Sequence, residues 1–204
     1  MMKHVVFDLG QVLISWFPER AFAAHFSDRD AIRDWMARVD FDGWNRLQDG
    51  GRPLAEGLAA ARAAFGDAAA PLMDYTQAFP ATITDPVPGS WEIAAELQAA
   101  GHRLFAITNW SADNWPAALA RYPGLTRLFE DIVVSGIERL LKPEADIYLA
   151  LTRRNRVAPE DCLFIDDSPA NVAGARAVGM EAIRFTDAPA LRRDLAARGL
   201  LPPS

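Results

Sequence analysis

An apolar run near the N-terminus, His4-Val5-Val6-Phe7, constrains the fold of this chain more than any other stretch. Its β-branched and aromatic residues, with no alternating polar positions, are typical of a strand buried on both faces of a parallel sheet. The run ends on a carboxylate, Asp8, followed by a glycine and further apolar residues. Because ligands bind at the carboxyl ends of strands in open α/β sheets, Asp8 is a candidate reactive group. The other interpretation of Asp8 is a turn or capping residue.

From Pro86 onward, short apolar runs alternate with amphipathic segments of helical length. The pattern predicts strands at 103–108, 131–135, 162–166 and 181–185, and helices at 90–100, 111–122, 144–154, 169–178 and 189–198. Strands separated by helices of this length indicate an α/β protein with a Rossmann-like, doubly wound parallel sheet.

Between the first strand and residue 85 the pattern is helical throughout. We predict helices at 31–39, 54–65 and 71–79, with a break at 40–43 and only a short helix or turn at 44–47. An all-helical block inserted directly after the first strand is most simply a cap over the carboxyl end of that strand. We therefore expect residues 1–15 plus 85–204 to form the α/β core and residues 16–84 to form the cap.

The composition narrows the possible partners. Of the 204 residues 50% are hydrophobic, which is enough to build a core, and the net charge of −6 argues against nucleic acid or an anionic membrane. No uninterrupted apolar stretch is long enough to span a bilayer, and the N-terminus leaves no room for a signal peptide, so a cytoplasmic protein is expected. The single cysteine, Cys162, lies in an apolar run and is expected to be a buried thiol.

Polar residues follow the predicted strands. Since such residues converge on one edge of a parallel sheet, we expect a site built from Asp8, Thr108, Asn109, Lys142, Asp166 and Asp167. An aspartate can accept a phosphoryl group, and a hydroxyl, an amide and an ammonium can hold its oxygens. Carboxylates also bind Mg²⁺, which offsets the charge of two anions brought together. Each residue alone has an ordinary structural explanation, but their shared position favours phosphoryl transfer.

Four segments resemble the motifs of the haloacid dehalogenase superfamily. They are Phe7-Asp8-Leu9-Gly10-Gln11-Val12-Leu13, Ile107-Thr108-Asn109, Leu141-Lys142-Pro143-Glu144 and Phe164-Ile165-Asp166-Asp167-Ser168. The spacings of 100, 34 and 24 residues between Asp8, Thr108, Lys142 and Asp166 suit a member with a helical cap after the first motif. The subgroup most similar to this chain is that of small bacterial sugar-1-phosphate phosphatases, α-D-glucose-1-phosphate phosphatase among them.

The resemblance implies a role for each motif. Asp8 would be the nucleophile, while Thr108, Asn109 and Lys142 would hold the transferring phosphoryl group. Mg²⁺ would be bound by Asp8, the main-chain carbonyl of Gly10 and Asp167, with Asp166 as a further ligand or a close neighbour. The partner would be a small phosphorylated metabolite, and the protein a monomer or homodimer; neither the metabolite nor the oligomeric state follows from the sequence.

One position departs from the pattern of the resembling phosphatases. Most of them carry a second aspartate two residues after the nucleophile, which protonates the leaving oxygen, and here that residue is Gly10. General acid–base catalysis contributes about 10²- to 10⁴-fold. An acidic leaving group such as an anomeric hydroxyl needs less protonation, which favours sugar 1-phosphates. Gln11 is expected to orient the hydrolytic water, and His25 is a candidate substitute for the acid.

Two alternatives stay open. Metal-independent 2-haloacid dehalogenases also lack the second aspartate, but those that resemble this chain carry Ser and Asn where Asp166 and Asp167 stand, because they hold no cation. The acidic pair therefore favours the phosphatase. A non-catalytic regulatory protein that has kept the phosphate site is the other alternative.

The cap is expected to supply substrate contacts. We predict Trp16 and Trp44 at the substrate, and further candidates are Trp110, Trp115, Arg20, Asn45 and Gln48.

Overall fold

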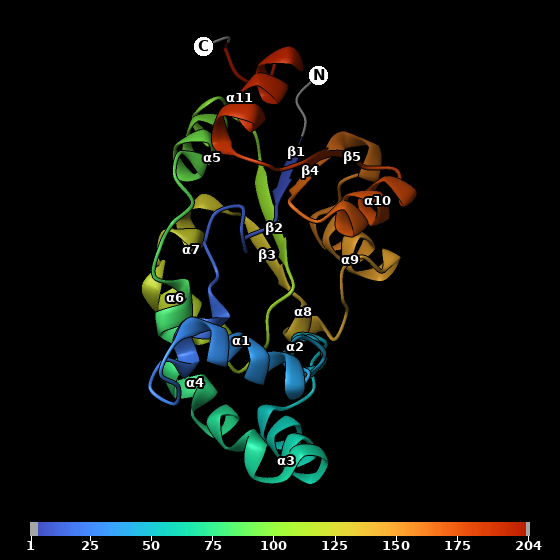
Figure 1. The fold of residues 1–204 in the computed structure, drawn as a ribbon. Helices are drawn as coiled ribbons and strands as arrows, with labels where there is room; N and C mark the ends of the chain where they lie inside the picture. Colours follow the sequence, from blue (N-terminus) through green and yellow to red (C-terminus); the bar gives the residue numbers. More distant parts are fainter. Residues whose placement is uncertain (1–3, 203–204) are drawn as a thin grey trace.

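A computed structural model describes residues 4–202 and shows a five-stranded parallel sheet (Figure 1). The strand order is β3-β2-β1-β4-β5. The strands are β1 (His4–Phe7), β2 (Leu104–Thr108), β3 (Asp131–Val134), β4 (Cys162–Asp166) and β5 (Glu181–Arg184). This arrangement confirms the predicted Rossmann-like α/β class. Residues of β1, β2 and β4 are almost all buried, which explains their continuous apolar sequence.

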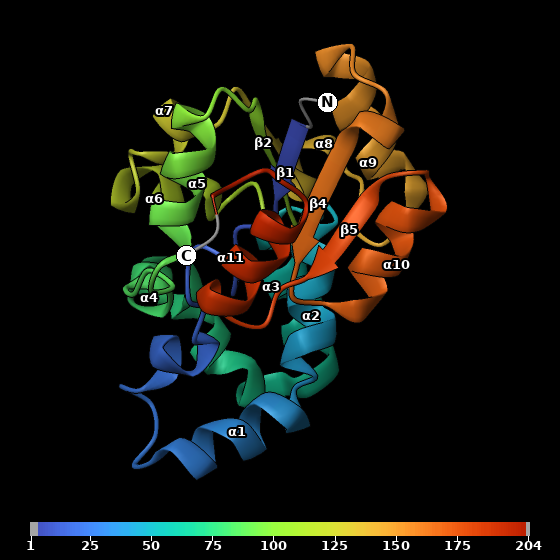
Figure 2. The same cartoon turned by 90° about the horizontal axis from the view of Figure 1, so that it is seen from above.

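Helices cover both faces of the sheet, because successive strand residues point to opposite sides (Figures 1 and 2). Phe7 of β1 belongs to a core shared with α5 (Ser90–Ala99), α6 (Trp115–Arg121), α7 (Leu125–Leu128) and α11 (Ala188–Ala197). Val6 belongs to a second core, with α9 (Ala145–Asn155) and α10 (Pro169–Ala177). Short α8 (Ser135–Glu138) and the 3-10 helix η4 (Pro159–Asp161) complete this part.

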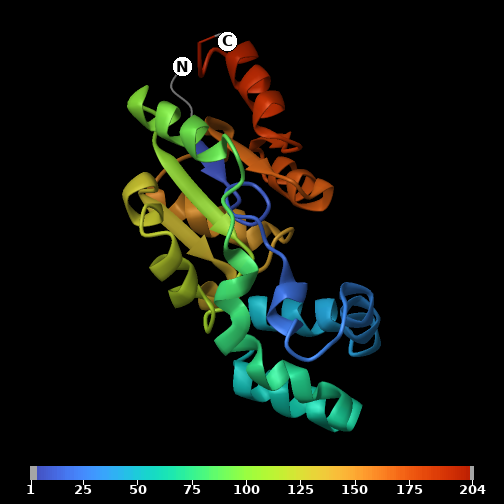
Figure 3. The same cartoon turned by 60° about the vertical axis from the view of Figure 1, so that its left-hand side comes forward.

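A helical cap lies beyond the carboxyl ends of the strands (Figure 3). It consists of η1 (Pro18–Phe22), α1 (Arg29–Arg38), α2 (Phe41–Asp49), α3 (Leu54–Phe65), η2 (Gly66–Asp74), α4 (Tyr75–Ala78) and η3 (Phe79–Ile83). Its centre is an aromatic cluster in which Tyr75 contacts Phe22, Phe41, Trp44 and Phe79 at ring-centroid distances of 5.4–5.8 Å. Aromatic pairs of this kind each contribute about 0.5–1.5 kcal/mol beyond area burial, which explains a stable cap without strands.

Several predicted boundaries in the helical segments are wrong. A helix does break at Asp40 as predicted, because Asp40 adopts a left-handed conformation (φ 46°) after α1 ends at Arg38, but the break is shorter than 40–43. Helix α2 already begins at Phe41, where the Asp40 carboxylate accepts from Gly43 N. The predicted helix at 71–79 is divided among η2, α4 and η3, with Pro71 and Pro80 each within a 3-10 segment. Proline lacks the N–H of a regular α-helical ladder, which accounts for the tighter turns. Helix α6 begins at Trp115, later than predicted.

Cys162 is a buried thiol outside any disulfide, as expected from its sequence context. Across residues 4–202, every helix falls short of the length and apolarity needed to cross a membrane.

Candidate active site

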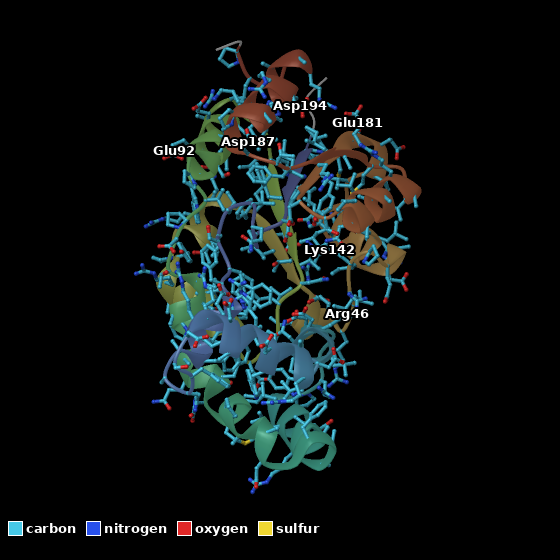
Figure 4. All side chains as sticks on the ribbon, viewed as in Figure 1. Arg46, Glu92, Lys142, Glu181, Asp187 and Asp194 are labelled. Atoms are coloured by element: carbon cyan, nitrogen blue, oxygen red, sulfur yellow. The ribbon has the colours of Figure 1, made fainter. Side chains whose placement is uncertain are left out.

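The ends of the three central strands bring the candidate residues together. Because β1 lies between β2 and β4, Asp8, Thr108 and Asp166 occupy neighbouring positions at one edge of the sheet. The Nζ atom of Lys142 lies 2.8 Å from Oδ1 of Asp8 and 2.7 Å from Oδ2 of Asp166. It also donates to the main-chain carbonyl of Ile107 at 3.0 Å. Figure 4 shows Lys142 between the sheet and the cap.

Burial controls the charge of this cluster. It raises the pKa of Asp8 to about 8, while the Lys142 ammonium acts in the opposite direction and the Asp166 carboxylate adds to the increase. Burial also opposes the charge on Lys142, but Asp8 and Asp166 outweigh it and raise the pKa of this lysine. Burial and Asp166 raise the pKa of the half-buried Asp167. Three carboxylates thus face a single ammonium, and a further cation would relieve their repulsion.

The donor set fits a divalent cation. Asp8, Asp166 and Asp167 each offer a carboxylate oxygen, and these oxygens lie within 4.8 Å of one another. Oxygen ligands of this kind suit hard cations. Asp166 already accepts from Lys142, from Ser168 N at 2.8 Å and from the Asn171 amide at 3.0 and 3.1 Å. Asp166 therefore suits an orienting role, with Asp8 and Asp167 as the direct ligands.

The Asn109 side chain holds the Lys142 segment in place. Its Oδ1 accepts from Lys142 N at 2.9 Å, and its Nδ2 donates to the Lys142 carbonyl at 3.1 Å. Helix α10 also approaches this segment closely, because a Cβ at Gly174 would lie 2.4 Å from the Pro143 carbonyl oxygen. The sequence predicted a phosphate contact for Asn109, whereas its side-chain amide is bonded to the lysine-bearing loop.

A cavity of about 180 Å³ separates the charged cluster from the cap. The segment after β1 contributes Asp8, Gly10, Gln11 and Trp16 to its wall, and the rest of the core contributes Asn109, Trp110, Ser111, Asn114 and Asp167. The cap helices contribute Asn45, Asp49, Tyr75 and Phe79. Gln11 has a left-handed backbone (φ 57°) and donates from Nε2 to the Trp16 carbonyl at 2.9 Å. Nε1 of Trp110 and Oδ1 of Asn114 are buried and lack a hydrogen-bond partner among residues 4–202.

Three other residues predicted to contact the substrate lie outside the described cavity wall. Trp44 is buried in the cap, where Nε1 donates to the Gly57 carbonyl at 2.9 Å, and it is absent from the described cavity wall. Gln48 is buried beside it and accepts from Arg52 at 2.6 Å. Arg20 pairs with Asp85 at 2.7 Å.

Three further predicted residues also lie outside this wall. His25 pairs with Asp74 at 3.1 Å. Trp115 packs against Trp110, with ring centroids 5.8 Å apart. Thr108 is only 1% exposed and lies behind the described wall at the end of β2.

Asp49 also lines the cavity, although it is absent from the residues predicted from the sequence. It is the last residue of α2, four positions after Asn45, and accepts from the Asn45 amide at 2.9 Å. The i, i+4 spacing places both side chains on one helix face. This spacing from Asn45, itself a predicted cap contact, is the sequence signal by which Asp49 could have been found.

Comparison with known proteins agrees with this geometry. A model of the haloacid dehalogenase-like hydrolase family matches residues 2–179. The chain belongs to that family. The predicted family resemblance is therefore confirmed, and the protein is placed among hydrolases.

Relatives with assigned activities are distant or partial. The chain is 31% identical over 112 residues to flavin mononucleotide hydrolase 1 of Arabidopsis thaliana, covering 55% of this chain and 45% of that one. It is 23% identical over 187 residues to the sesquiterpene phosphatase AstK of Aspergillus oryzae, covering 91% and 90%. It is 30% identical over 83 residues to fructose-1-phosphate phosphatase YqaB of Escherichia coli, covering 41% and 44%. The chain thus aligns with less than half the length of two of these relatives.

Solved structures share the whole fold. A family enzyme from Bacteroides thetaiotaomicron, BT-2542, matches with a TM-score of 0.73 at 22% identity, covering 91% of this chain and 94% of that one. L-2-haloacid dehalogenase from Xanthobacter autotrophicus matches with a TM-score of 0.68 at 25% identity, covering 99% and 85%.

Proposed function

We propose that the protein is a Mg²⁺-dependent phosphatase that hydrolyses small phosphate monoesters through an aspartyl-phosphate on Asp8. The observation that carries the proposal is the charged cluster, in which Lys142 bridges Asp8 and Asp166 while Asp167 adds a third carboxylate at the cavity wall. A cation held by Asp8, Asp167 and the Gly10 carbonyl would neutralise the excess negative charge and polarise a phosphoryl oxygen.

Several residues of the chain contribute to the first step, the transfer of the phosphoryl group to Asp8. An oxygen of Asp8 attacks phosphorus, and the bond from phosphorus to the leaving oxygen breaks. The Lys142 ammonium, fixed between two carboxylates, stabilises the negative charge that gathers on the phosphoryl oxygens, and Thr108 at the end of β2 supplies a hydroxyl on the same side. Asn109 keeps Lys142 in position through the main chain. Water then attacks the aspartyl-phosphate and regenerates Asp8.

Sugar 1-phosphates are the substrate class that we favour. The cavity wall combines aromatic faces, including Trp16 and Tyr75, with the polar groups of Asn45 and Asp49. Such surfaces suit a ligand that has both apolar faces and hydroxyls. The buried unpaired atoms of Trp110 and Asn114 add hydrogen-bonding capacity near the wall. Fructose-1-phosphate phosphatase YqaB, a partial relative, acts on a substrate of this class.

A second candidate, metal-independent 2-haloacid dehalogenase, is favoured by one observation. Gly10 stands where an acid would protonate an alcohol, and a halide leaves without a proton. The acidic pair opposes this candidate, since Asp167 would place negative charge beside a haloacid carboxylate.

One experiment tests the proposal against both alternatives. Purified protein is assayed for phosphate release from a panel that includes hexose 1-phosphates, with Mg²⁺ or with EDTA, and for halide release from 2-haloacids. We expect phosphate release only with Mg²⁺, and a loss of about 10⁴-fold or more in Asp8→Asn, which lacks the nucleophile. Asp42→Asn, an exposed position on the cap, is the matched control and should keep full activity.

Different outcomes contradict different parts of the proposal. Full activity in Asp8→Asn would exclude the aspartyl-phosphate mechanism. Halide release that EDTA leaves unchanged would establish the dehalogenase, and phosphate binding without turnover of any substrate would establish the regulatory binder.

A further inference from the structure

We propose that Asp49 is the general acid of the reaction, a cap residue that protonates the leaving-group oxygen in place of the aspartate missing at Gly10. The inference rests on the proposed phosphatase function and adds a catalytic residue to it. It also accounts for how a chain without the second aspartate of its first motif could still hydrolyse esters of poorly acidic alcohols.

Asp49 lies in the cavity on the wall opposite the charged cluster. Three aspartates line the cavity, of which Asp8 and Asp167 belong to the charged cluster. Among the described residues of the wall, Asp49 is the one carboxyl left for proton transfer. It comes from the cap, whereas Asp8 comes from the sheet, so the cavity lies between a nucleophile and a separate carboxyl group. In-line displacement needs this arrangement, because the leaving group departs on the side opposite the nucleophile.

Hydrogen bonds from both the cap and the core orient Asp49. The main-chain carbonyl of Asp49 accepts from Oγ of the fully buried Ser135 at 2.6 Å, and the same Oγ accepts from Trp110 N at 2.9 Å. This bridge joins the end of α2 to the core loop at the cavity. The Asp49 carboxyl accepts from the Asn45 amide at 2.9 Å and from the backbone N–H of Ser111. Contacts from both the cap and the core therefore hold the carboxyl in a fixed place.

The surroundings of Asp49 favour its protonated form. Burial raises the pKa of Asp49 to about 7, although the Ser111 N–H and the Arg46 guanidinium act against the increase. The other titratable groups at this cavity are Asp8 and Asp167 on the core side and Tyr75 on α4. Burial raises the pKa of Tyr75 far above its usual value, which makes this phenol a poor proton donor near neutral pH. A group with a pKa near the working pH can donate a proton in one step and accept one in the next.

Asp49 gives up a proton in the first step and regains one in the second. As the bond between phosphorus and the leaving oxygen breaks, the Asp49 proton moves to that oxygen, which gives an alcohol and leaves Asp49 as a carboxylate. In the second step water attacks phosphorus, the bond to Asp8 breaks, and the proton of the water passes to Asp49. The products are an alcohol and phosphate, and both aspartates return to their starting forms.

The test compares two leaving groups in Asp49→Asn, with Mg²⁺ present. Acetyl phosphate releases acetate, which needs no proton, whereas a hexose 1-phosphate releases an alcohol. We compare kcat/KM, which covers only the steps up to departure of the leaving group and is independent of the later hydrolysis of the aspartyl-phosphate. We expect kcat/KM for the hexose 1-phosphate to fall by about 10²-fold or more, and kcat/KM for acetyl phosphate to change by less than about threefold. Asp42→Asn on the same helix, whose side chain is exposed, is the matched control and should change neither rate.

A second variant tests the same idea in the opposite direction. A Cβ at Gly10 meets no atom within 4 Å, and Gly10 lines the cavity, so Gly10→Asp can place an acid there. In the Asp49→Asn background, Gly10→Asp should restore at least about tenfold of the lost activity on the hexose 1-phosphate. A residue that only binds the substrate or supports the fold would not be rescued by an acid on the opposite wall.

The outcomes separate the two proposals. An equal fall on both substrates would assign Asp49 to binding and overturn its role as an acid, as would an unchanged rate on the hexose 1-phosphate. If the wild-type protein hydrolyses no phosphate monoester with Mg²⁺, the proposed function fails and this inference fails with it. An active wild type that loses activity in Asp8→Asn but not in Asp49→Asn overturns this inference alone.

Discussion

The two walls of the cavity are built in different ways. The core wall collects Asp8, Lys142 and Asp166 from three separate segments of the chain, and direct ion pairs of 2.7 and 2.8 Å connect them. The cap wall comes from one stretch between Phe41 and Phe79, and it rests on an aromatic cluster rather than on charge. Under the proposed mechanism, this difference assigns the phosphoryl group to the core wall and the leaving group to the cap wall.

The difference also predicts where the molecule is sensitive to substitution. In the core wall, each charged group compensates another, so the removal of one leaves the others buried without a partner. In the cap wall, the carboxyl of Asp49 is half-buried and accepts hydrogen bonds from neutral donors, the Asn45 amide and the Ser111 main chain. Removal of this carboxyl therefore leaves no buried charge behind.

The largest expected effect is that of Lys142→Met. This change keeps the side-chain length and removes the ammonium, which leaves Asp8 and Asp166 buried without their cation. We expect a loss of about 3–5 kcal/mol in the free energy of unfolding, together with loss of phosphatase activity. Urea denaturation at neutral pH measures the change. Arg46→Met, at an exposed cationic position on the cap (Figure 4), should cost less than about 0.5 kcal/mol; equal losses in the two variants would contradict the contrast between the walls.

An intermediate effect is expected where the two walls join. A Cβ at Gly136 would lie 2.5 Å from Ala112 N and 2.8 Å from the Trp110 carbonyl oxygen, and such backbone atoms cannot move aside easily. We expect Gly136→Ala to lower the free energy of unfolding by about 1–3 kcal/mol. Gly10→Ala is the matched comparison for stability and should change it by less than about 0.5 kcal/mol, since its Cβ meets no atom within 4 Å. A Gly136→Ala protein as stable as the wild type would refute the close approach.

The smallest expected effect concerns the pH dependence of stability. Because the pKa of Asp49 is raised to about 7 in the folded protein, folding favours its protonated form, and its contribution to stability declines as the pH rises toward 7. Asp49→Asn removes this decline. When the pH is raised from 5 to 8, the free energy of unfolding of the variant should increase by about 1 kcal/mol relative to that of the wild type. This value allows for the partial solvent exposure of the Asp49 carboxyl. Thermal unfolding at both pH values measures the difference; a constant difference would show that Asp49 keeps an ordinary pKa.

Local patterns predicted the core wall because its residues follow buried strands. The continuous apolar character of β1, β2 and β4 identified them as central parallel strands, and the parallel arrangement alone brings Asp8, Thr108 and Asp166 to one edge. The position of Lys142 after the third strand placed it at the same edge. The fold class and the charged cluster could therefore be derived from the order of residues along the chain.

The cap wall depended on tertiary packing. The sequence predicted helices there, but which face of α2 meets the cavity is set by how Phe41 and Trp44 pack around Tyr75. That packing turns Trp44 into the cap and Asp49 toward the cavity, the reverse of the substrate contact expected for Trp44. Helical periodicity identifies an apolar face but not the neighbour that it meets. Local sequence patterns were thus sufficient to predict the sheet and the place of Asp8 at its edge, whereas the orientation of Asp49 toward the cavity depends on how the cap packs.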